Sequence, residues 1–325
     1  MLQSFSQLLE KVNAHIETLD YAHEPMHLYE PVKYILSLGG KRIRPAMMLM
    51  AYNMYRDNVE AILDPALALE IYHNFTLLHD DLMDNADMRR GNPTVHKRWD
   101  ANTAILSGDV MLSLADVYMS RVDDACFREV MATFHRTSIE IAEGQQYDMD
   151  FETRDDVTEE EYIEMIRLKT SVLLACALKI GAVLGGATKE DAELLYRLGE
   201  SIGLAFQLRD DYLDVYGDPK VFGKKIGGDI LCNKKTYLYI NALRLADKEQ
   251  RAVLDYWATA VDFKPEEKIA AVTDVYNKVG LPEMSRKAED MYYRRAQEAL
   301  EALSVAEEKK QVLREFMAAL MERNV

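Results

Sequence analysis

The chain has 325 residues, of which 49% are hydrophobic, so it can bury the core of one large globular domain or two ordinary ones. Its 55 acidic residues outnumber its 39 basic residues, and the net charge of −16 argues against nucleic acid as a general partner. Three widely separated cysteines, Cys126, Cys176 and Cys232, favour reduced thiols in a cytoplasmic protein over disulfides.

Apolar residues recur at i, i+3 and i+4 along most of the chain, which predicts an all-α fold. No run approaches 18 uninterrupted apolar residues, so we expect no membrane-spanning segment. No linker rich in Ser, Gly and Pro interrupts the pattern, which favours a single domain over 1–325. Prolines and glycine pairs place the helices near 2–20, 25–38, 44–56, 65–85, 99–120, 124–150, 158–186, 189–217, 234–246, 248–260, 266–279 and 283–302, with a last one to about 323.

The second predicted helix is followed by LSLGGKRIRPAMML, which places Lys41, Arg42 and Arg44 after a glycine pair. Exposed backbone NH groups before the next helix suit an anion there. A solvated basic turn is the alternative interpretation.

The apolar helix 65–85 ends in HDDLMD, which sets Asp80, Asp81 and Asp84 at i, i+1 and i+4. Asp80 and Asp84 therefore share a helix face, where their charges repel unless a cation bridges them. Mg²⁺ suits so sparse a motif because it completes its shell with water and substrate phosphates. An acidic surface turn is the alternative. His73, about two turns earlier, either fills the core or reaches a ligand.

Arg89 and Arg90 follow this motif directly. Arginine binds phosphate oxygens through two parallel hydrogen bonds, and two consecutive side chains point in different directions. The pair therefore indicates two phosphorylated ligands.

A second DDxxD motif, formed by Asp210, Asp211 and Asp214, ends another hydrophobic helix. Two such motifs facing each other would hold Mg²⁺ ions around one diphosphate, and the repeat favours metal binding over an acidic turn. Lys169 and Thr170 lie in a mostly apolar helix, where a lone lysine needs an anionic partner or must extend to solvent. The later loop carries further lysines, Lys224, Lys225, Lys234 and Lys235, and solvated lysines are the alternative there.

In order and spacing, these features resemble the trans-isoprenyl diphosphate synthases of the polyprenyl synthetase family. The matching motifs cover essentially the whole chain: GGKRIRP at 39–45, HDDLMDNADMRRGNPTVH at 79–96, ILSGD at 105–109, EGQQYD at 143–148, LKT at 168–170, FQLRDDYLD at 206–214, and GKKIGGD with NKKT at 223–236. The resemblance implies an all-α bundle around a deep cavity, a homodimer, and a reaction that joins isopentenyl diphosphate to an allylic diphosphate.

The resemblance also implies a role for each matching residue. About three Mg²⁺ ions would be bound by Asp80, Asp81, Asp84, Asp210 and Asp214, with Asp211 in support. The allylic diphosphate would be held by Arg89, Lys169, Lys224 and Lys234, with Lys225 as the alternative to Lys224. Isopentenyl diphosphate would be held by Lys41, Arg44, His73 and Arg90. Thr170 and Gln207 would face the reacting carbons.

Product length would depend on the side chains below Asp80. Thr76 and Phe75 lie about 6 and 7.5 Å lower along the helix. A large aromatic at this place goes with short products in the family, so Phe75 is the expected cavity floor and C20 is favoured over C15. The alternatives are a longer-chain synthase, a Phe75 that merely packs between helices, a class I terpene cyclase and a non-catalytic partner subunit.

Overall fold

The computed structural model describes residues 2–20, 23–218 and 226–322, where the predicted all-α class is confirmed. Strands in these ranges are limited to an antiparallel hairpin of β1 (Met88–Arg89) and β2 (Asn92–Pro93). The longer helices are α1 (Phe5–Glu17), α2 (Met26–Ser37), α3 (Ile43–Asn53), α4 (Leu63–Met83), α6 (Ala101–Met119), α7 (Asp124–Glu152), α8 (Glu159–Ile166), α9 (Val172–Gly185), α10 (Lys189–Tyr216), α13 (Tyr237–Leu245), α14 (Lys248–Thr259), α15 (Pro265–Lys278), α16 (Leu281–Glu301) and α17 (Glu307–Glu322).

Every predicted helix has a counterpart within a few residues, but the shortest elements were not predicted. They are η1 (Val59–Ile62), α5 (Val95–Arg98), α12 (Gly228–Leu231) and the hairpin. Elements this short are below the length over which hydrophobic periodicity can be recognised. The predicted helix 158–186 is in fact α8 and α9 joined by a π-helical segment, η2 (Arg167–Ser171).

The core is built around α9, which is buried on nearly all sides and packs against α3 and α10. Glycines permit this approach: a Cβ on Gly181 would lie 2.2 Å from the Met48 carbonyl oxygen. The stretch Glu159–Gly185 is long and apolar enough to cross a membrane, but 78% of its most apolar window is buried inside the protein. Its apolar character is therefore accounted for by core packing.

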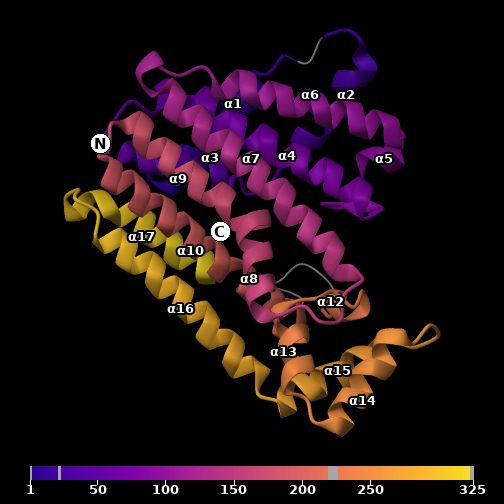
Figure 1. The fold of residues 1–325 in the computed structure, drawn as a ribbon. Coiled ribbons are helices and arrows are strands. Elements are labelled where there is room, and N and C mark those ends of the chain that lie inside the picture. The colour runs from indigo at the N-terminus through magenta and orange to yellow at the C-terminus, as the bar shows by residue number, and fades with distance from the viewer. Residues whose placement is uncertain (1, 21–22, 219–225, 323–325) are drawn as a thin grey trace.

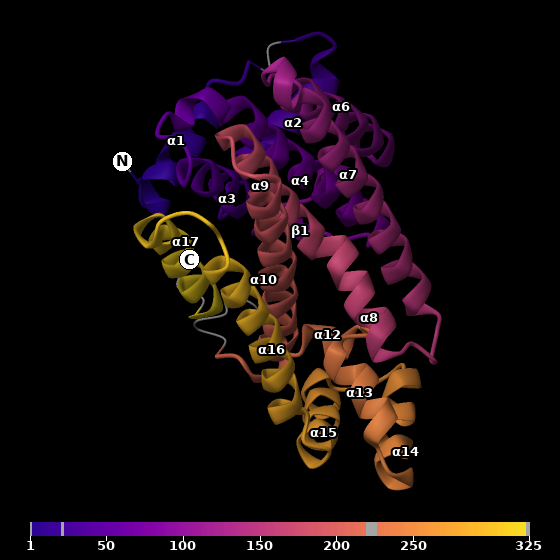
Figure 2. The ribbon, with the colours of Figure 1, turned by 60° about the vertical axis from the view of Figure 1, so that its left-hand side comes forward.

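The helices α13, α14 and α15 lie together at the end of the molecule opposite α1 (Figures 1 and 2). They enclose an apolar cluster of their own, to which Tyr276 and Leu254 contribute. The helix α10 ends beside the short helix α12, between the two parts (Figure 2). The first aspartate motif lies at the end of α4 and the second at the end of α10.

Candidate active site

The first aspartate motif lies at the C-terminal end of α4, where its three side chains have different surroundings. Asp80 is half-buried and accepts a hydrogen bond from Lys169 Nζ at 3.2 Å. Asp81 is buried and accepts one from Arg89 Nε at 2.7 Å. Burial and the neighbouring Asp80 carboxylate raise the pKa of Asp84. Asp80 also lies 3.6 Å from Arg89 Nη2, so both Asp80 and Asp81 are paired with cationic side chains, and metal binding by Asp80, Asp81 and Asp84 stays a prediction.

The second motif, at the end of α10, has a buried aspartate at its centre. Asp211 accepts hydrogen bonds from the Tyr162 hydroxyl, from Gln207 Nε2 at 3.2 Å and from the Tyr237 backbone NH at 3.3 Å. Burial raises the pKa of Asp211 to about 6. These donors fix the Asp211 carboxylate, and its supporting role at the metal site stays a prediction. Asp214 also has a fixed carboxylate, which accepts from the Asp229 NH at 3.0 Å.

Both motifs share one electrostatic environment. Burial lowers the pKa of the Lys234 amine, but surrounding carboxylates outweigh this effect and raise it to about 12. These carboxylates include Asp80 of the first motif and Asp211 of the second, together with Asp148 and Asp229. Carboxylates of both motifs therefore contribute to the electrostatic environment of the same lysine.

The donor set suits a hard divalent cation. Across the described ranges, no three His, Cys, Asp or Glu side chains converge to form a complete metal site on their own. Mg²⁺ does not need such a site, because one or two carboxylates, waters and substrate phosphates complete its octahedron. The carboxylates of Asp80 and Asp84 present the oxygen ligands that Mg²⁺ prefers, and a cation would relieve the repulsion between them, which adds to the effect of burial on the pKa of Asp84.

The π-helical segment η2 places Lys169 and Thr170 beside the cavity. The Lys169 amine lies 2.6 Å from Asp148 Oδ2 of α7 and 3.2 Å from Asp80 Oδ1, which supplies the anionic partners that its apolar helix lacks. The Thr170 hydroxyl lies 3.5 Å from Gln207 Oε1, so these two predicted neighbours of the reacting carbons do meet. Single π-helical turns within α-helices are often found at functional sites.

A second cationic site lies beside His73. Burial lowers the pKa of Arg44 to about 10, and Arg44 Nε is buried without a hydrogen-bond partner. Burial also lowers the pKa of Arg90, whose Nη1 donates to the Gly39 carbonyl. A buried guanidinium with an unsatisfied donor is costly without an anion, so this pocket suits a second diphosphate. As predicted, Arg89 and Arg90 point to different places.

Two basic neighbours of Arg44 differ in burial. Lys41 is exposed. Arg42 is only 5% exposed, and its guanidinium pairs with Glu70 and donates to the Leu36 carbonyl oxygen at 2.6 Å. The sequence places Arg42 on the basic turn without assigning it a ligand, and in the structure the buried carboxylate of Glu70 neutralises its charge.

The surroundings of His73 predict a pH dependence of stability. Burial and then the Arg44 cation lower the pKa of His73 well below its usual value, so the folded ring stays neutral. The unfolded chain takes up this proton near pH ~6.5, so the contribution of His73 to stability is present above that pH and lost as the pH falls. We expect the unfolding temperature to fall from about pH 7 to 5, and less steeply in His73→Gln. Equal slopes in thermal denaturation would contradict this prediction.

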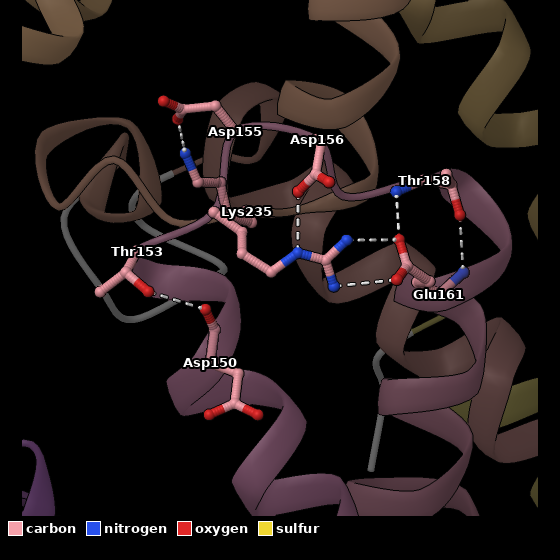
Figure 3. A network of polar contacts seen from close by, with 8 residues as sticks. Asp150, Thr153, Asp155, Asp156, Thr158, Glu161 and Lys235 are labelled. Carbon is pink, nitrogen blue, oxygen red and sulfur yellow. Dashed lines mark hydrogen bonds and ion pairs between the residues drawn. The ribbon is translucent and has the colours of Figure 1, made fainter.

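The segment NKKT is anchored by side chains that point away from the site. Lys235 Nζ pairs with Asp155 Oδ1 at 2.9 Å (Figure 3). It also lies 5.1 Å from the centre of the Tyr239 ring. The loop that carries Asp155 ends in a capping box between Thr158 and Glu161 at the start of α8 (Figure 3). These contacts leave Lys234 as the lysine of this segment that faces the aspartates.

Replacement of each of these two lysines should separate their roles. Lys234→Ala removes a charge that faces both motifs, so we expect the KM for the allylic diphosphate to rise about 10- to 100-fold. Lys235→Ala breaks an ion pair with an exposed aspartate, which is worth less than about 1 kcal/mol, so its kinetics should stay close to wild type. Steady-state kinetics with the allylic substrate varied would measure both. A larger effect for Lys235→Ala would reverse the assignment.

A cavity of about 450 Å³ is lined by Asp80, Lys169 and Thr170 and also by Arg44 and His73. Its polar end carries Asp80, Lys169 and Arg44, and its apolar part descends along α4 past Thr76 and Phe75. The wall opposite is formed by residues of α6, α7 and α9, among them Leu112, Ser138, Ile141, Ala142 and Leu173. Both residues predicted to limit the cavity therefore line it.

Some site residues were not predicted, and some predicted ones cannot be placed. Glu70, Asp148 and Tyr162 contact predicted site residues, but each is an isolated polar residue with no repeat or spacing to mark it. Only the EGQQYD match included Asp148, without a role. Lys224 and Lys225 lie outside the described residues.

Comparisons with known proteins agree with this geometry. A family model described as polyprenyl synthetase matches residues 25–278. A geranylgeranyl diphosphate synthase of Methanosarcina mazei is 46% identical over 71% of this chain and 72% of its own length. A geranylfarnesyl diphosphate synthase of Natronomonas pharaonis is 40% identical over 72% and 74%. The crystal structure of a geranylgeranyl pyrophosphate synthase covers 98% of this chain and 99% of its own, with a TM-score of 0.93 at 44% identity.

Proposed function

Because the chain belongs to the polyprenyl synthetase family and is a trans-prenyltransferase, we propose that it joins isopentenyl diphosphate to an allylic diphosphate and releases pyrophosphate. The product is a short-chain trans-polyprenyl diphosphate, with C20 favoured over C15. One observation carries the proposal: a single cavity has two cationic sites, one beside the aspartates and one around Arg44 and His73. A cyclase needs only the first of these sites.

The aspartates and the lysines have different roles at the allylic diphosphate. About three Mg²⁺ ions, held by Asp80, Asp84, Asp210 and Asp214, would neutralise charge on the departing diphosphate. Lys169 and Lys234 add fixed positive charge where that negative charge develops. Asp81 orients Arg89 toward the same phosphates, and Asp211 fixes Gln207.

The apolar cavity protects the reaction from water. When the allylic C–O bond breaks, the carbocation must meet the alkene of isopentenyl diphosphate before it meets water. The Thr170 hydroxyl and the Gln207 amide place dipoles beside the reacting carbons. The new C–C bond forms, one proton leaves the condensed product, and pyrophosphate accepts it.

We also propose that 1–325 forms a single domain. Its three apolar clusters are connected through α16, since Tyr292 packs against the first two clusters and Met284 against the second and third. The proposed location is the cytoplasm.

A homodimer is proposed from the surface of α6 and α7. These two helices expose large apolar side chains: Ile105, Leu106, Val117, Phe127 and Ile139. Apolar exposure of this kind on neighbouring helices is typical of an interface. Light scattering of the purified protein would test this state.

Product analysis tests the proposed reaction. Purified protein would be incubated with Mg²⁺, isopentenyl diphosphate and dimethylallyl, geranyl or farnesyl diphosphate in turn. We expect pyrophosphate release that depends on isopentenyl diphosphate, with C20 as the main product. Consumption of the allylic substrate alone would indicate a cyclase, and no turnover of any pair would indicate a non-catalytic partner.

A further inference from the structure

Glu70 is a buried carboxylate on α4 that lies outside both aspartate motifs. It is 2% exposed, and its Oε1 accepts hydrogen bonds from the Arg42 guanidinium and from Asn74 Nδ2, the latter at 2.7 Å. Asn74 also donates to the Glu70 carbonyl oxygen at 2.8 Å. A buried ion pair must be satisfied in this way to be tolerated, and removal of one partner leaves an uncompensated charge.

Through Arg42, Glu70 holds an unusual backbone conformation. Arg42 is the N-cap of α3 and has φ 48°, in the left-handed region that residues with a Cβ seldom adopt. The preceding Gly39 and Gly40 also have positive φ, of 76° and 141°. Such backbone persists only where surrounding contacts hold it. Here the Arg42 side chain is fixed by Glu70 and by the Leu36 carbonyl oxygen.

This turn carries two of the residues assigned to the second diphosphate. Lys41 precedes Arg42, and Arg44 lies in the first turn of the helix that Arg42 begins. Arg90 is tied to the same turn, because it donates to the Gly39 carbonyl oxygen. The position of the turn therefore decides where these cations meet a ligand.

We propose that Glu70 is a positioning residue for the isopentenyl diphosphate pocket, which it shapes by fixing Arg42 and the turn that carries Lys41 and Arg44. The inference rests on the proposed function for the identity of the ligand, but the geometry requires only that the pocket binds a diphosphate. Glu70 also acts electrostatically on Arg44 and Arg90, where it opposes the effect of burial on their charge.

The direction in which diphosphate affinity changes when Glu70 loses its charge distinguishes a positioning role from a purely electrostatic one. If Glu70 acted only as a negative charge near the pocket, its neutralisation would tighten anion binding. If it positions the turn, its neutralisation loosens the cations and weakens binding. Glu70→Gln keeps the shape of the side chain and removes its charge. Asp191→Asn is the matched control, because Asp191 is equally buried at 2% and accepts hydrogen bonds from Tyr55 and Ser304 outside the cavity.

The first measurement is calorimetric titration with inorganic diphosphate in the absence of divalent metal, so that the aspartate motifs cannot contribute. We expect affinity to fall about 10- to 100-fold in Glu70→Gln and to stay at the wild-type level in Asp191→Asn. Unchanged or tighter binding by folded Glu70→Gln would overturn the inference. Arg42→Lys, which keeps the charge but cannot make both hydrogen bonds, gives the same test if Glu70→Gln does not fold.

The second measurement is steady-state kinetics with each substrate varied in turn. Glu70→Gln should raise the KM for isopentenyl diphosphate and leave the KM for the allylic diphosphate nearly unchanged, whereas a general structural defect would raise both. An inactive wild-type protein whose diphosphate affinity still depends on Glu70 would refute the proposed reaction but not the positioning role.

Discussion

Replacement of Asp80 by alanine should reduce turnover with Mg²⁺ and both substrates by about 10²- to 10³-fold or more, while the fold remains intact. Asp80 lies at the polar end of the cavity, contacts Lys169 at 3.2 Å and shares a helix face with Asp84. Its loss removes a proposed ligand of the metals and a partner of Lys169. Stability should change little, because Asp80 is half-buried and its removal also relieves repulsion with Asp84.

A control for this variant lies in the turn that follows α4. Asp87 is an exposed carboxylate that pairs with Lys97 at 3.0 Å and faces neither motif. Asp87→Ala removes the same charge from the same region, and we expect wild-type turnover. The two variants would be compared by pyrophosphate release and by thermal denaturation. Substantial activity in folded Asp80→Ala would remove the first motif from the catalytic machinery.

The helices could be predicted because a period of 3.6 residues persists through each long one, and because prolines and glycines mark their ends. The π-helical segment η2 could not, since the same residues would also continue an α-helix. What favours it lies elsewhere in the chain: Gly144 of α7 lies so close that a Cβ there would be 2.4 Å from the Lys169 nitrogen. Such contacts are set by tertiary packing and have no local pattern.

The site residues divide in the same way, into those marked by a local sequence pattern and those whose contacts are set by tertiary packing. The aspartate motifs could be found because each repeats a spacing that places carboxylates on one helix face. Glu70 and Asp148 could not, because their importance comes from the cations they meet, which are distant in sequence. Arg42 shows the same limit: the sequence places it on a basic turn, and only the structure shows that Glu70 holds it in the interior.

The second large effect is expected on the length of the product, from a substitution at Phe75. Phe75 lines the cavity, and its ring makes edge contacts with Tyr72 and His79, with ring centres 5.5 and 4.8 Å apart. Phe75→Ala should let the growing chain pass this ring, so we expect products longer than C20. The extension should be limited, because Tyr72 lines the cavity about 4.5 Å further along the helix axis. Chromatography of the products after removal of their diphosphates would measure the shift.

Tyr72 is well placed to stop the longer chain. It is 2% exposed, its hydroxyl donates to the Ser138 carbonyl oxygen at 3.3 Å, and its ring packs edge-on against Phe134 at 5.3 Å. We therefore expect Phe75→Ala to add about one isoprene unit, and Phe75→Ala with Tyr72→Ala to add more. Phe134→Ala is the control, because Phe134 is buried behind Tyr72 and does not line the cavity. It should lower stability by about 3–5 kcal/mol without lengthening the product. An unchanged product length in Phe75→Ala would show that this ring only packs between helices, and the floor would then be sought at Tyr72 itself.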